Sequence, residues 1–582
     1  MTRHITTEVD VCVVGGGMAG LIAALAAARH GARVALMHDR PVLGGNASSE
    51  CRVHICGADR HNMTAHLRET GILEELRLAN LRHNPQRSFS VWDTLLYDAC
   101  RRQPNLTLLL NCSANQATMA SPSRIGSVSG WQGTSQTWQT VRAKVFIDAS
   151  GDAILAPLTG AAFRFGREAR SEYGESLAPE QADKGTMGMT VAFGARPTDS
   201  PQEFTPPPWA RRFDRCEDLP AGVNGHSWWV QGYWWTELGG MHHSIHDTER
   251  VRDELLAVCL GIWDHIKNRC RRRDEAANWV LDWVQHTPAK RESRRYVGQH
   301  VLTQDEVMSG GALPDVVAYG GWTIDEHPPV GVLCGKLGLS PSYHASTPMP
   351  YGIPYGSLVA RDIENLMFAG RCASASHIAM SSARVMGTGA VMGQAAGTAA
   401  ALAAAAGVAP IALRQDIGPL QQALIHDDCH VPGVSQSFNE LTRRVRYVGA
   451  GNVEPLRDGW GRKIGPADHA WPCKVGDRLE ILFDRDERVE HLVLAADSCM
   501  ELEIQMSFWQ RSKQIAGLPP RLLKDATVEV LADGQWRPAA TVRGNYDRLV
   551  RIPVSRRCRG VRLTLDATWG QGQTNLYAAW VE

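Results

Sequence analysis

The sequence has no excess of charge of either sign. Among its 582 residues, 61 Lys and Arg balance 61 Asp and Glu. Proteins that bind nucleic acid or acidic membranes through their surfaces carry a basic patch or a net positive charge. The balance therefore predicts no nucleic-acid partner and no membrane partner, and it directs attention to small molecules.

The sequence also has no CxxC pair, although it contains 14 cysteines. That absence excludes the common zinc-binding and thioredoxin-type spacings. Scattered thiols are typical of small buried side chains in a reducing compartment. We expect no metal site, although a histidine-rich stretch (His242, His243 and His246) could bind a metal ion adventitiously.

Long apolar segments are scarce. Residues 1–10 lack the apolar stretch of a secretory signal. The one long apolar run, 390–410, is rich in Ala and Gly and includes Gln394, which favours a buried helix over a membrane span. We expect a cytoplasmic protein, and nothing in the sequence excludes an oligomer.

A βαβ unit is present near the N-terminus. Residues 9–14 are apolar, glycines follow at once, and a helical run extends from Leu21 to His30. A second apolar strand covers Val34–Met37. The pattern predicts the first part of a parallel, Rossmann-like sheet.

The glycines between strand and helix fit the GxGxxG spacing. Such glycines allow a tight turn, close approach of a pyrophosphate, and contact between helix and strand, while the helix N-terminus supplies backbone N–H groups. The residues of this predicted dinucleotide site are Gly15, Gly17, Met18, Ala19 and Gly20. The alternative is an ordinary glycine-rich turn.

The acidic residue that usually follows the second strand and binds a ribose is displaced. His38 stands at that position, and Asp39 comes next. Either Asp39 takes the role after a small shift of register, or the ribose is held in another way. We favour Asp39.

The composition and periodicity of the sequence change three times along the chain. Trp, Arg and His are enriched between Gly166 and Ser340, the α/β pattern returns from Asn365, and a period of two begins after about residue 452. We predict an α/β fold in which a Rossmann-like dinucleotide-binding domain is interrupted by a substrate domain and followed by an antiparallel β-sandwich. The predicted parts are 1–165 with 341–410 (dinucleotide binding), 166–340 (substrate), 411–451 (helical connector) and 452–582 (sandwich). The predicted sandwich strands are Leu479–Phe483, Val489–Ala495, Met500–Met506, Thr527–Leu531, Arg548–Val554 and Val561–Leu565.

Several segments together resemble one family. They are RPVLGGNASSE (40–50), FIDASGD (146–152), NLMFAGRCASASH (365–377) and SSARVMGTGAVMGQAAGTAAA (381–401). Residues 9–410 as a whole resemble the FAD-dependent oxidoreductases built on the glutathione-reductase/fumarate-reductase plan.

The resemblance implies that the dinucleotide is FAD and that the predicted dinucleotide-binding domain is an FAD-binding domain. Besides Asp39, it adds these cofactor-binding residues: Arg40, Gly44, Gly45, Asn46, Ala47, Ser48, Asp148, Gly151, Asp152, Gly370, Arg371, Arg384, Gly389 and Ala390. Gly389 and Ala390 are expected to begin a helix whose positive end faces the flavin. Related enzymes often attach FAD through a His after the glycines, where this chain has Ala47, Ser48 and Ser49. We therefore predict a non-covalent flavin, and Cys51 and His54 leave the covalent alternative open.

An enzyme that oxidises an alcohol needs a base for the hydroxyl proton, and histidine suits this task near neutral pH. Four histidines lie in motif-like loops: His54, His327, His344 and His377. We expect the catalytic residues among His377, His327, His54, Arg291 and Glu237. Arg291 lies in a charged run, 290–295, which could instead be a solvated surface.

Substrate contacts are predicted at Trp234, Trp235, Arg294, Tyr343 and His344. Paired tryptophans could form a stacking wall for a sugar, or they could simply fill a core. Nine of the 18 tryptophans lie between Trp209 and Trp322 and six between Trp460 and Trp580, outside the predicted cofactor segments.

Three functional hypotheses remain open. The first is an FAD enzyme that oxidises a hydroxylated small molecule, a sugar or glycoside, and passes electrons to an unknown acceptor. The second is a fumarate-reductase-like reductase or desaturase that acts on a C=C bond of a carboxylate. The third is a non-enzymatic carbohydrate-binding or scaffold protein.

Overall fold

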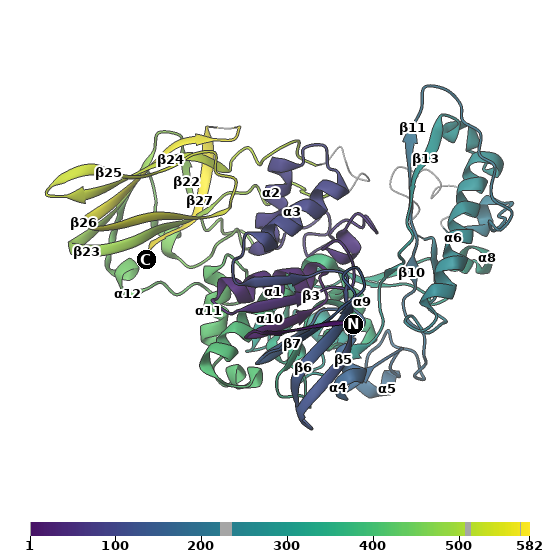
Figure 1. Cartoon of the computed structure of the whole chain (residues 1–582). Helices are drawn as coiled ribbons and strands as arrows, with labels where there is room; N and C mark the ends of the chain where they lie inside the picture. The colour runs from purple at the N-terminus through teal and green to yellow at the C-terminus, as the bar shows by residue number, and fades with distance from the viewer. Residues whose placement is uncertain (1, 221–234, 507–513, 571) are drawn as a thin grey trace.

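The computed structural model describes residues 2–220, 235–506, 514–570 and 572–582. Its central sheet is parallel, as predicted, and includes the predicted βαβ unit, of which Figure 1 labels α1 and β3. The strand order is β20 (Leu366–Phe368), β8 (Val145–Asp148), β2 (Val11–Val14), β3 (Val34–Met37) and β4 (Leu106–Leu109). Each of the four neighbouring pairs among these five strands is parallel, and β2, β3 and β8 are buried throughout. A continuous apolar run is what a parallel strand covered on both faces requires.

Two helices pack closely on one side of this sheet. They are α1 (Met18–Arg29) and α10 (Met386–Ala406), and both are rich in Ala and Gly. A Cβ added at Gly393 would lie 2.1 Å from the carbonyl oxygen of Ala19, and one at Gly397 would lie 2.1 Å from that of Ala23. The small residues therefore let the two backbones touch.

By length and composition alone, α10 could cross a membrane, and among the described helices it alone meets that test. Most of its residues are buried inside the protein against α1, as expected for a core helix. The predicted start of this helix at Gly389 was wrong by one turn. The helix begins at Met386, because Val385 is still extended and Gly389 already donates to the Val385 carbonyl.

A second sheet and several helices complete the core. The second sheet has the order β1 (Arg3–Glu8), β7 (Thr137–Arg142), β6 (Arg124–Gln132) and β5 (Cys112–Ser121). The further helices are α2 (Ile72–His83), α3 (Phe89–Arg101), α4 (Leu155–Thr159), α5 (Arg170–Tyr173), α7 (Gln304–Ser309), α9 (His377–Ala383), α11 (Gly418–His426) and α12 (Glu440–Arg444).

The inserted region contributes small antiparallel sheets and lies beside the central sheet, on the opposite side from the C-terminal sheet (Figure 1). Its elements include β10 (Met189–Thr190), β11 (Phe193–Pro197), β12 (Glu237–Leu238), α6 (Thr248–Asp264), β13 (Trp279–Val284), β14 (Ala289–Lys290) and α8 (Cys334–Leu337). Four further strands return toward the core: β16 (Val316–Gly320), β17 (Ile324–Glu326), β18 (Tyr343–Ala345) and β19 (Tyr351–Pro354). The pairs β12–β10–β14 and β17–β18 hold the side chains discussed below.

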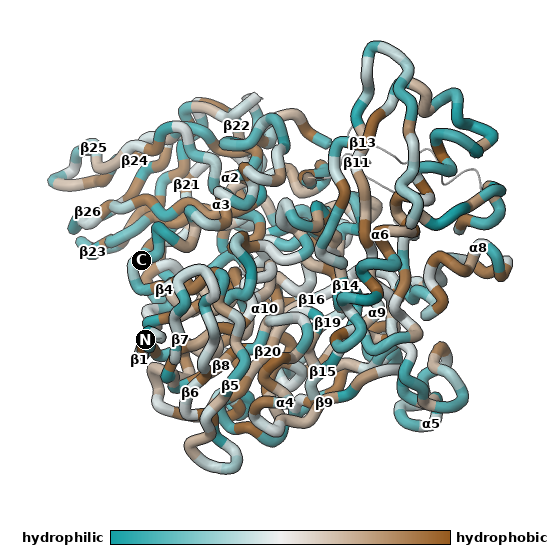
Figure 2. Tube along the Cα trace, turned by 45° about the vertical axis from the view of Figure 1, so that its right-hand side comes forward, coloured by the Kyte–Doolittle hydropathy of each residue, from teal (hydrophilic) through white to brown (hydrophobic). Residues whose placement is uncertain are grey.

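The C-terminal domain is antiparallel, as predicted, and apolar and polar residues alternate along its strands (Figure 2). Its strands are β21 (Arg446–Val448), β22 (Trp471–Lys474), β23 (Arg478–Ala496), β24 (Leu523–Ala532), β25 (Gln535–Val542), β26 (Leu549–Thr568) and β27 (Gln573–Val581). Two pairs of predicted short strands are single long strands, β23 and β26. The charged residues between the first two predicted strands, 484–488, form a mostly exposed stretch of β23 rather than a break between two strands.

The predicted strand Met500–Met506 is not a strand. It is a turn followed by irregular chain, and it crosses from the C-terminal domain to the core. Arg68, buried and paired with Glu74, donates to the carbonyls of Leu502 and Ser498. The alternating apolar residues of this segment pack against neighbouring parts of the protein, so the period of two did not require a sheet.

Candidate functional site

A cavity of about 570 Å³ lies where β2, β8 and β20 end, which is where open α/β sheets bind their ligands. Its volume is within the range of small-molecule sites. One end is lined by the glycine segments and the other by residues of the inserted region.

The two glycine segments lie against each other. Gly17 pairs with Gly44 in a parallel bridge, and a Cβ added at Gly45 would lie 3.0 Å from the Cα of Gly17. Gly15 has φ +100°, and a Cβ there would lie 2.5 Å from the backbone of Ala149. Side chains are thus excluded from this surface, and the first N–H groups of α1 are left for a ligand.

The side chain of His38 forms hydrogen bonds that hold the glycine loop after β2. Its Nδ1 accepts a hydrogen bond from the Gly16 amide at 3.0 Å, and its Nε2 lies 3.0 Å from the carbonyl of Val42. Burial lowers the pKa of His38, consistent with a neutral ring that accepts at Nδ1. The side chain of Asp39 also lines the cavity and is 61% exposed.

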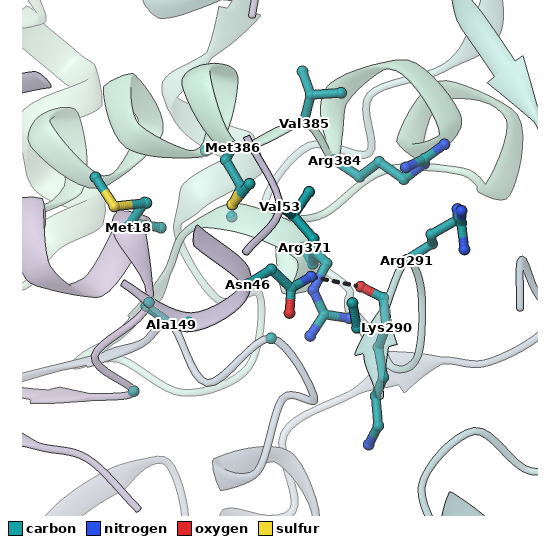
Figure 3. A pocket seen from close by; sticks show the side chains of 18 of the residues that line it. Met18, Asn46, Val53, Ala149, Lys290, Arg291, Arg371, Arg384, Val385 and Met386 are labelled. Atoms are coloured by element: carbon teal, nitrogen blue, oxygen red, sulfur yellow. Dashed lines mark hydrogen bonds between the residues drawn. The ribbon is translucent and has the colours of Figure 1, made fainter. Parts of the chain in front are cut away.

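Two cationic side chains, Lys290 and Arg371, lie near Asn46 in the cavity (Figure 3). Lys290 Nζ is 2.6 Å from Asp152 Oδ2, and Arg371 Nη2 is 3.9 Å from Asp152 Oδ1. Burial opposes ionisation of Asp152, but Lys290 and Arg371 lower its pKa. Asn46 donates to the backbone carbonyl of Lys290 at 3.1 Å. These residues combine two cations with fixed polar groups, which suits a diphosphate.

Most of the predicted cofactor residues line the cavity. They are Gly15, Gly17, Met18, Ala19, Asp39, Arg40, Gly44, Gly45, Asn46, Gly151, Asp152, Gly370, Arg371, Arg384 and Gly389. Those absent from the lining are Gly20, Ala47, Ser48, Asp148 and Ala390. Gly20 and Asp148 lie behind the lining and fix the backbone that forms it. A Cβ at Gly20 would lie 1.8 Å from the Gly15 carbonyl oxygen, and Asp148 accepts from the backbone of Ser150 and Leu155.

At the other end of the cavity, His327 is held between two carboxylates. Its Nδ1 is 2.8 Å from Glu237 Oε2, and its Nε2 is 3.4 Å from Asp325 Oδ1. Arg291 Nη1 lies 3.2 Å from the same Glu237 oxygen. Burial opposes ionisation of Glu237, but Arg291 and His327 lower its pKa, so that it is a carboxylate near neutral pH.

A second arginine faces the same space. Arg384 Nη2 lies 3.3 Å from Asp325 Oδ2, and Figure 3 shows the Arg384 and Arg291 guanidinium groups on the same side of the cavity. Burial opposes ionisation of Asp325, but His327 and Arg384 hold its pKa well below the usual range. The substrate end therefore pairs two cations with two anions around one histidine.

Aromatic rings flank this group. Trp235 and Trp322 line the cavity, and Trp322 Nε1 donates to Asp325 Oδ2 at 3.3 Å. His344 also lines it, opposite Asp325 in the β17–β18 pair. Among the other predicted substrate residues, Trp234 lies outside the described residues, and the lining does not include Arg294 or Tyr343. The Arg294 guanidinium lies over the Phe163 ring, and Tyr343 is 52% exposed.

His377 is not part of the lining. It is fully buried, with Nδ1 2.9 Å from Glu292 and Nε2 3.4 Å from Glu326. Burial opposes its protonation, but Glu292 raises the pKa of His377 to about 9. Arg295, also buried, pairs with Glu292 and Glu168. This network joins the inserted region to α9, and it keeps His377 away from the cavity surface.

Two residues of the cavity wall, Cys56 and His61, were not predicted from the sequence. His54 lines the cavity as one of the predicted catalytic candidates, but it does so beside Cys56 and His61, which were not predicted. Burial opposes ionisation of Cys56, but His54 and His61 lower the pKa of its thiol to about 6. The spacing His-x-Cys-x₄-His was the available signal. Burial raises the pKa of the nearby Cys51 to about 11, and Cys51 is absent from the lining.

Comparison with known proteins adds a family. The family described as "FAD dependent oxidoreductase" matches residues 10–424, which include both glycine segments and the substrate end. A search of curated proteins found no match. The family favours the two enzymatic hypotheses over the non-enzymatic one.

Several solved structures show similarity. A geranylgeranyl bacteriochlorophyll reductase-like protein from Thermoplasma acidophilum is 12% identical over 73% of this chain and 85% of its own, with a TM-score of 0.31. The FrdA protein of E. coli quinol fumarate reductase is 13% identical over 72% and 74%, with a TM-score of 0.28. A family 32 carbohydrate-binding module of Streptococcus pneumoniae EndoD is 14% identical over 23% and 94%, with a TM-score of 0.18. At these TM-scores the similarities carry no argument.

The residues present fit FAD. The surface around Gly17 and Gly45 excludes side chains, the start of α1 offers backbone N–H groups, and Lys290 and Arg371 supply positive charge. The glycine segments and His327 line one and the same cavity. The cofactor is therefore FAD, as the sequence predicted.

Proposed function

The chain belongs to the family of FAD-dependent oxidoreductases, and we propose that it oxidises a hydroxyl group of a small molecule of the sugar or glycoside class. The observation that carries this proposal is the His327–Glu237 pair at the substrate end of the cavity, joined at 2.8 Å. FAD, when bound, supplies the acceptor for the hydride that leaves the carbon.

In this proposal His327 is the general base. The Nδ1–H group donates a hydrogen bond to Glu237, which leaves the lone pair on Nε2 to accept the proton of the substrate hydroxyl. The other ring nitrogen, Nε2, lies 3.4 Å from Asp325 Oδ1. Arg291 keeps Glu237 ionised, which stabilises the imidazolium that forms when His327 accepts the proton.

The sugar class is supported by the aromatic walls. Trp235 and Trp322 contribute aromatic rings to the lining of the cavity, and Asp325 and His344 contribute hydrogen-bonding groups to it. Sugar rings present both an apolar face and several hydroxyls, so such a mixed wall is complementary to them. An unidentified acceptor completes the reaction by reoxidising the flavin.

The flavin is proposed to be non-covalent. Cys51 is buried, donates to the Thr287 carbonyl, and is protonated at neutral pH because burial raises its pKa to about 11. Neither Ala47 nor Ser48 offers a nucleophile that reaches the cavity lining. Acid precipitation should release all the yellow colour into the supernatant, and flavin retained by the pellet would contradict this part of the proposal.

The test is anaerobic reduction of the bound flavin by a panel of sugars, glycosides and enoates. A sugar or glycoside should bleach the flavin, and His327→Gln should slow bleaching by about 10²–10⁴-fold, the usual contribution of a general base. His300→Gln is a matched control, since His300 also pairs with a glutamate but is not in the lining. Bleaching at the wild-type rate by His327→Gln would refute the assignment.

The second candidate is reduction of a C=C bond in a carboxylate. The observation in its favour is the pair Arg291 and Arg384, because two guanidinium groups facing one space can bind a carboxylate. In that case prereduced enzyme would be reoxidised by an enoate, and no sugar or glycoside would bleach the oxidised flavin.

A further inference from the structure

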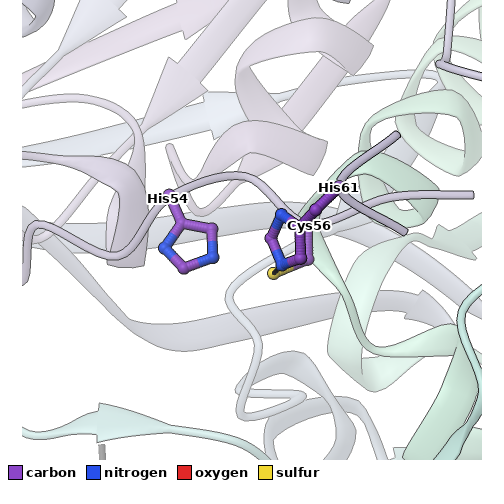
Figure 4. A group of neighbouring side chains, drawn as sticks. All are labelled: His54, Cys56 and His61. Carbon is purple, nitrogen blue, oxygen red and sulfur yellow. Dashed lines mark hydrogen bonds between the residues drawn. The ribbon is translucent and has the colours of Figure 1, made fainter. Parts of the chain in front are cut away.

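Three metal-ligating side chains meet on one wall of the cavity. They are His54, Cys56 and His61, and one ligand atom from each lies within 4.8 Å of the others (Figure 4). Cys56 Sγ is 3.8 Å from His61 Nε2, and the two histidine rings are 4.9 Å apart. All three residues line the cavity, so the group is open to it on one side.

Two polar residues stand behind His61. Gln505 lies 2.7 Å and Glu503 3.5 Å from Nδ1 of its ring, on the side away from Cys56. Both come from the segment that crosses from the C-terminal domain. Histidines that bind metals usually donate their other ring N–H to a carboxylate or carbonyl, which fixes the tautomer and aims the second nitrogen at the ion.

Glu503 is a buried carboxylate whose ion-pair partner among the described residues is His61. It is 1% exposed, its Oε1 lies 3.5 Å from His61 Nδ1, and neither carboxylate oxygen meets a donor of the described residues with good hydrogen-bond geometry. Gln505 Oε1 is likewise buried without such a bond, and exchange of its amide O and N would let it accept from His61 Nδ1. Buried carboxylates are costly unless a positive charge compensates them.

We propose that His54, Cys56 and His61 bind one divalent metal ion of the zinc class, with Glu503 and Gln505 as supporting residues. Thiolate and imidazole are the ligands that zinc prefers, and zinc, Cys56 thiolate and Glu503 carboxylate together sum to zero charge. Three protein ligands leave a fourth position, which faces the cavity and takes an oxygen of water or of a bound molecule.

The donor spacing is close to what such a site needs. Tetrahedral zinc with Zn–S of about 2.3 Å and Zn–N of about 2.0 Å sets donor atoms roughly 3.5 Å apart. The 3.8 Å between Cys56 and His61 is close to this value, and the other separations, all within 4.8 Å, need at most roughly 1 Å of adjustment by side-chain rotation. Unlike the cluster of Cys216, His265 and Cys270, which is buried throughout, this group opens onto the site of chemistry.

The experiment is a Co²⁺ titration of the chelator-treated, FAD-loaded enzyme, followed by absorbance of the thiolate-to-cobalt charge-transfer band. Wild type and Cys56→Ser are compared, so that any cobalt at the Cys216 cluster cancels in the difference. Cys51→Ser is the matched control, because Cys51 is buried on the same segment but is not among the clustered residues.

The wild type should bind one more equivalent of cobalt than Cys56→Ser, and Cys51→Ser should behave as wild type. Glu503→Gln should weaken cobalt binding by about 10–100-fold, the usual effect of losing such a supporting carboxylate. If a variant fails to hold flavin, the test is made on the wild type instead. There, Zn²⁺ should protect one thiol from a thiol reagent. Equal cobalt binding in wild type and Cys56→Ser, or no metal-dependent thiol protection, would overturn the proposal. Both readouts are independent of the substrate.

Discussion

Glu237→Gln is the substitution that tests the proposed mechanism most directly. Glu237 is 2% exposed, accepts from His327 Nδ1 at 2.8 Å and lies 3.2 Å from Arg291. Glutamine keeps the shape but removes the charge. Its amide can also donate to Nδ1, which would move the ring proton to Nε2 and leave His327 unable to accept a proton from substrate.

The expected loss follows from these two effects. A general base contributes about 10²–10⁴-fold, and a wrong tautomer of a catalytic histidine costs about 10⁴-fold in the well-known serine-protease case. We therefore expect the anaerobic rate of flavin reduction to fall by about 10³–10⁴-fold. The FAD site lies at the other end of the cavity, so flavin content should be unchanged.

The assay is stopped-flow flavin reduction under anaerobic conditions with saturating substrate. The matched control is Glu306→Gln, because Glu306 also accepts from a histidine, His300, at 2.8 Å but lies outside the cavity. A Glu237→Gln enzyme that retains its flavin and reduces it within threefold of the wild-type rate would refute the reasoning. So would an equal loss in the Glu306→Gln control.

Three further predictions concern cofactor binding and stability. Gly45→Ala should weaken FAD binding at least tenfold, because its Cβ would lie 3.0 Å from the Cα of Gly17, and flavin absorbance per protein measures this loss. Gly31→Ala is the control: Gly31 also has a positive φ, but no atom lies near its Cβ position, so this variant should keep its flavin. The pKa of His377 is raised to about 9, so its stabilising contribution is complete below about pH 6.5 and is lost as the pH rises through 9; denaturant unfolding should show this loss in wild type and a flatter profile in His377→Gln. Gly393→Val should lower stability by several kcal/mol in the same assay, because α1 and α10 would be forced apart, and an unchanged midpoint would contradict the close contact.

The cofactor end was predictable because its determinants are local. A glycine needed for a positive φ or a close backbone approach is visible as a glycine, and Gly15, Gly44 and Gly45 show positive φ in the structure. The departure at His38 was also visible, but its meaning was not. Only the fold shows that a neutral His38 ring accepts from Gly16 and so supports the loop.

In the C-terminal domain, the alternation of apolar and polar residues predicted the individual strands less accurately than the glycine motifs predicted the cofactor site. It identified an antiparallel sheet, yet it divided β23 and β26 and assigned a strand to Met500–Met506. That segment alternates apolar and polar residues because it too has a buried and a polar side. Its partners are the core and His61 rather than a neighbouring strand.

The sequence by itself determined the family, the cofactor and the order of the layers, because these depend on short motifs and on hydrophobic periodicity. The tertiary structure decided which histidine meets a carboxylate at the cavity. His327 and Glu237 are 90 residues apart, and His61 and Gln505 are 444 apart. Contacts of this kind depend on how the inserted region and the C-terminal domain pack on the core, and such packing leaves no local pattern in the chain.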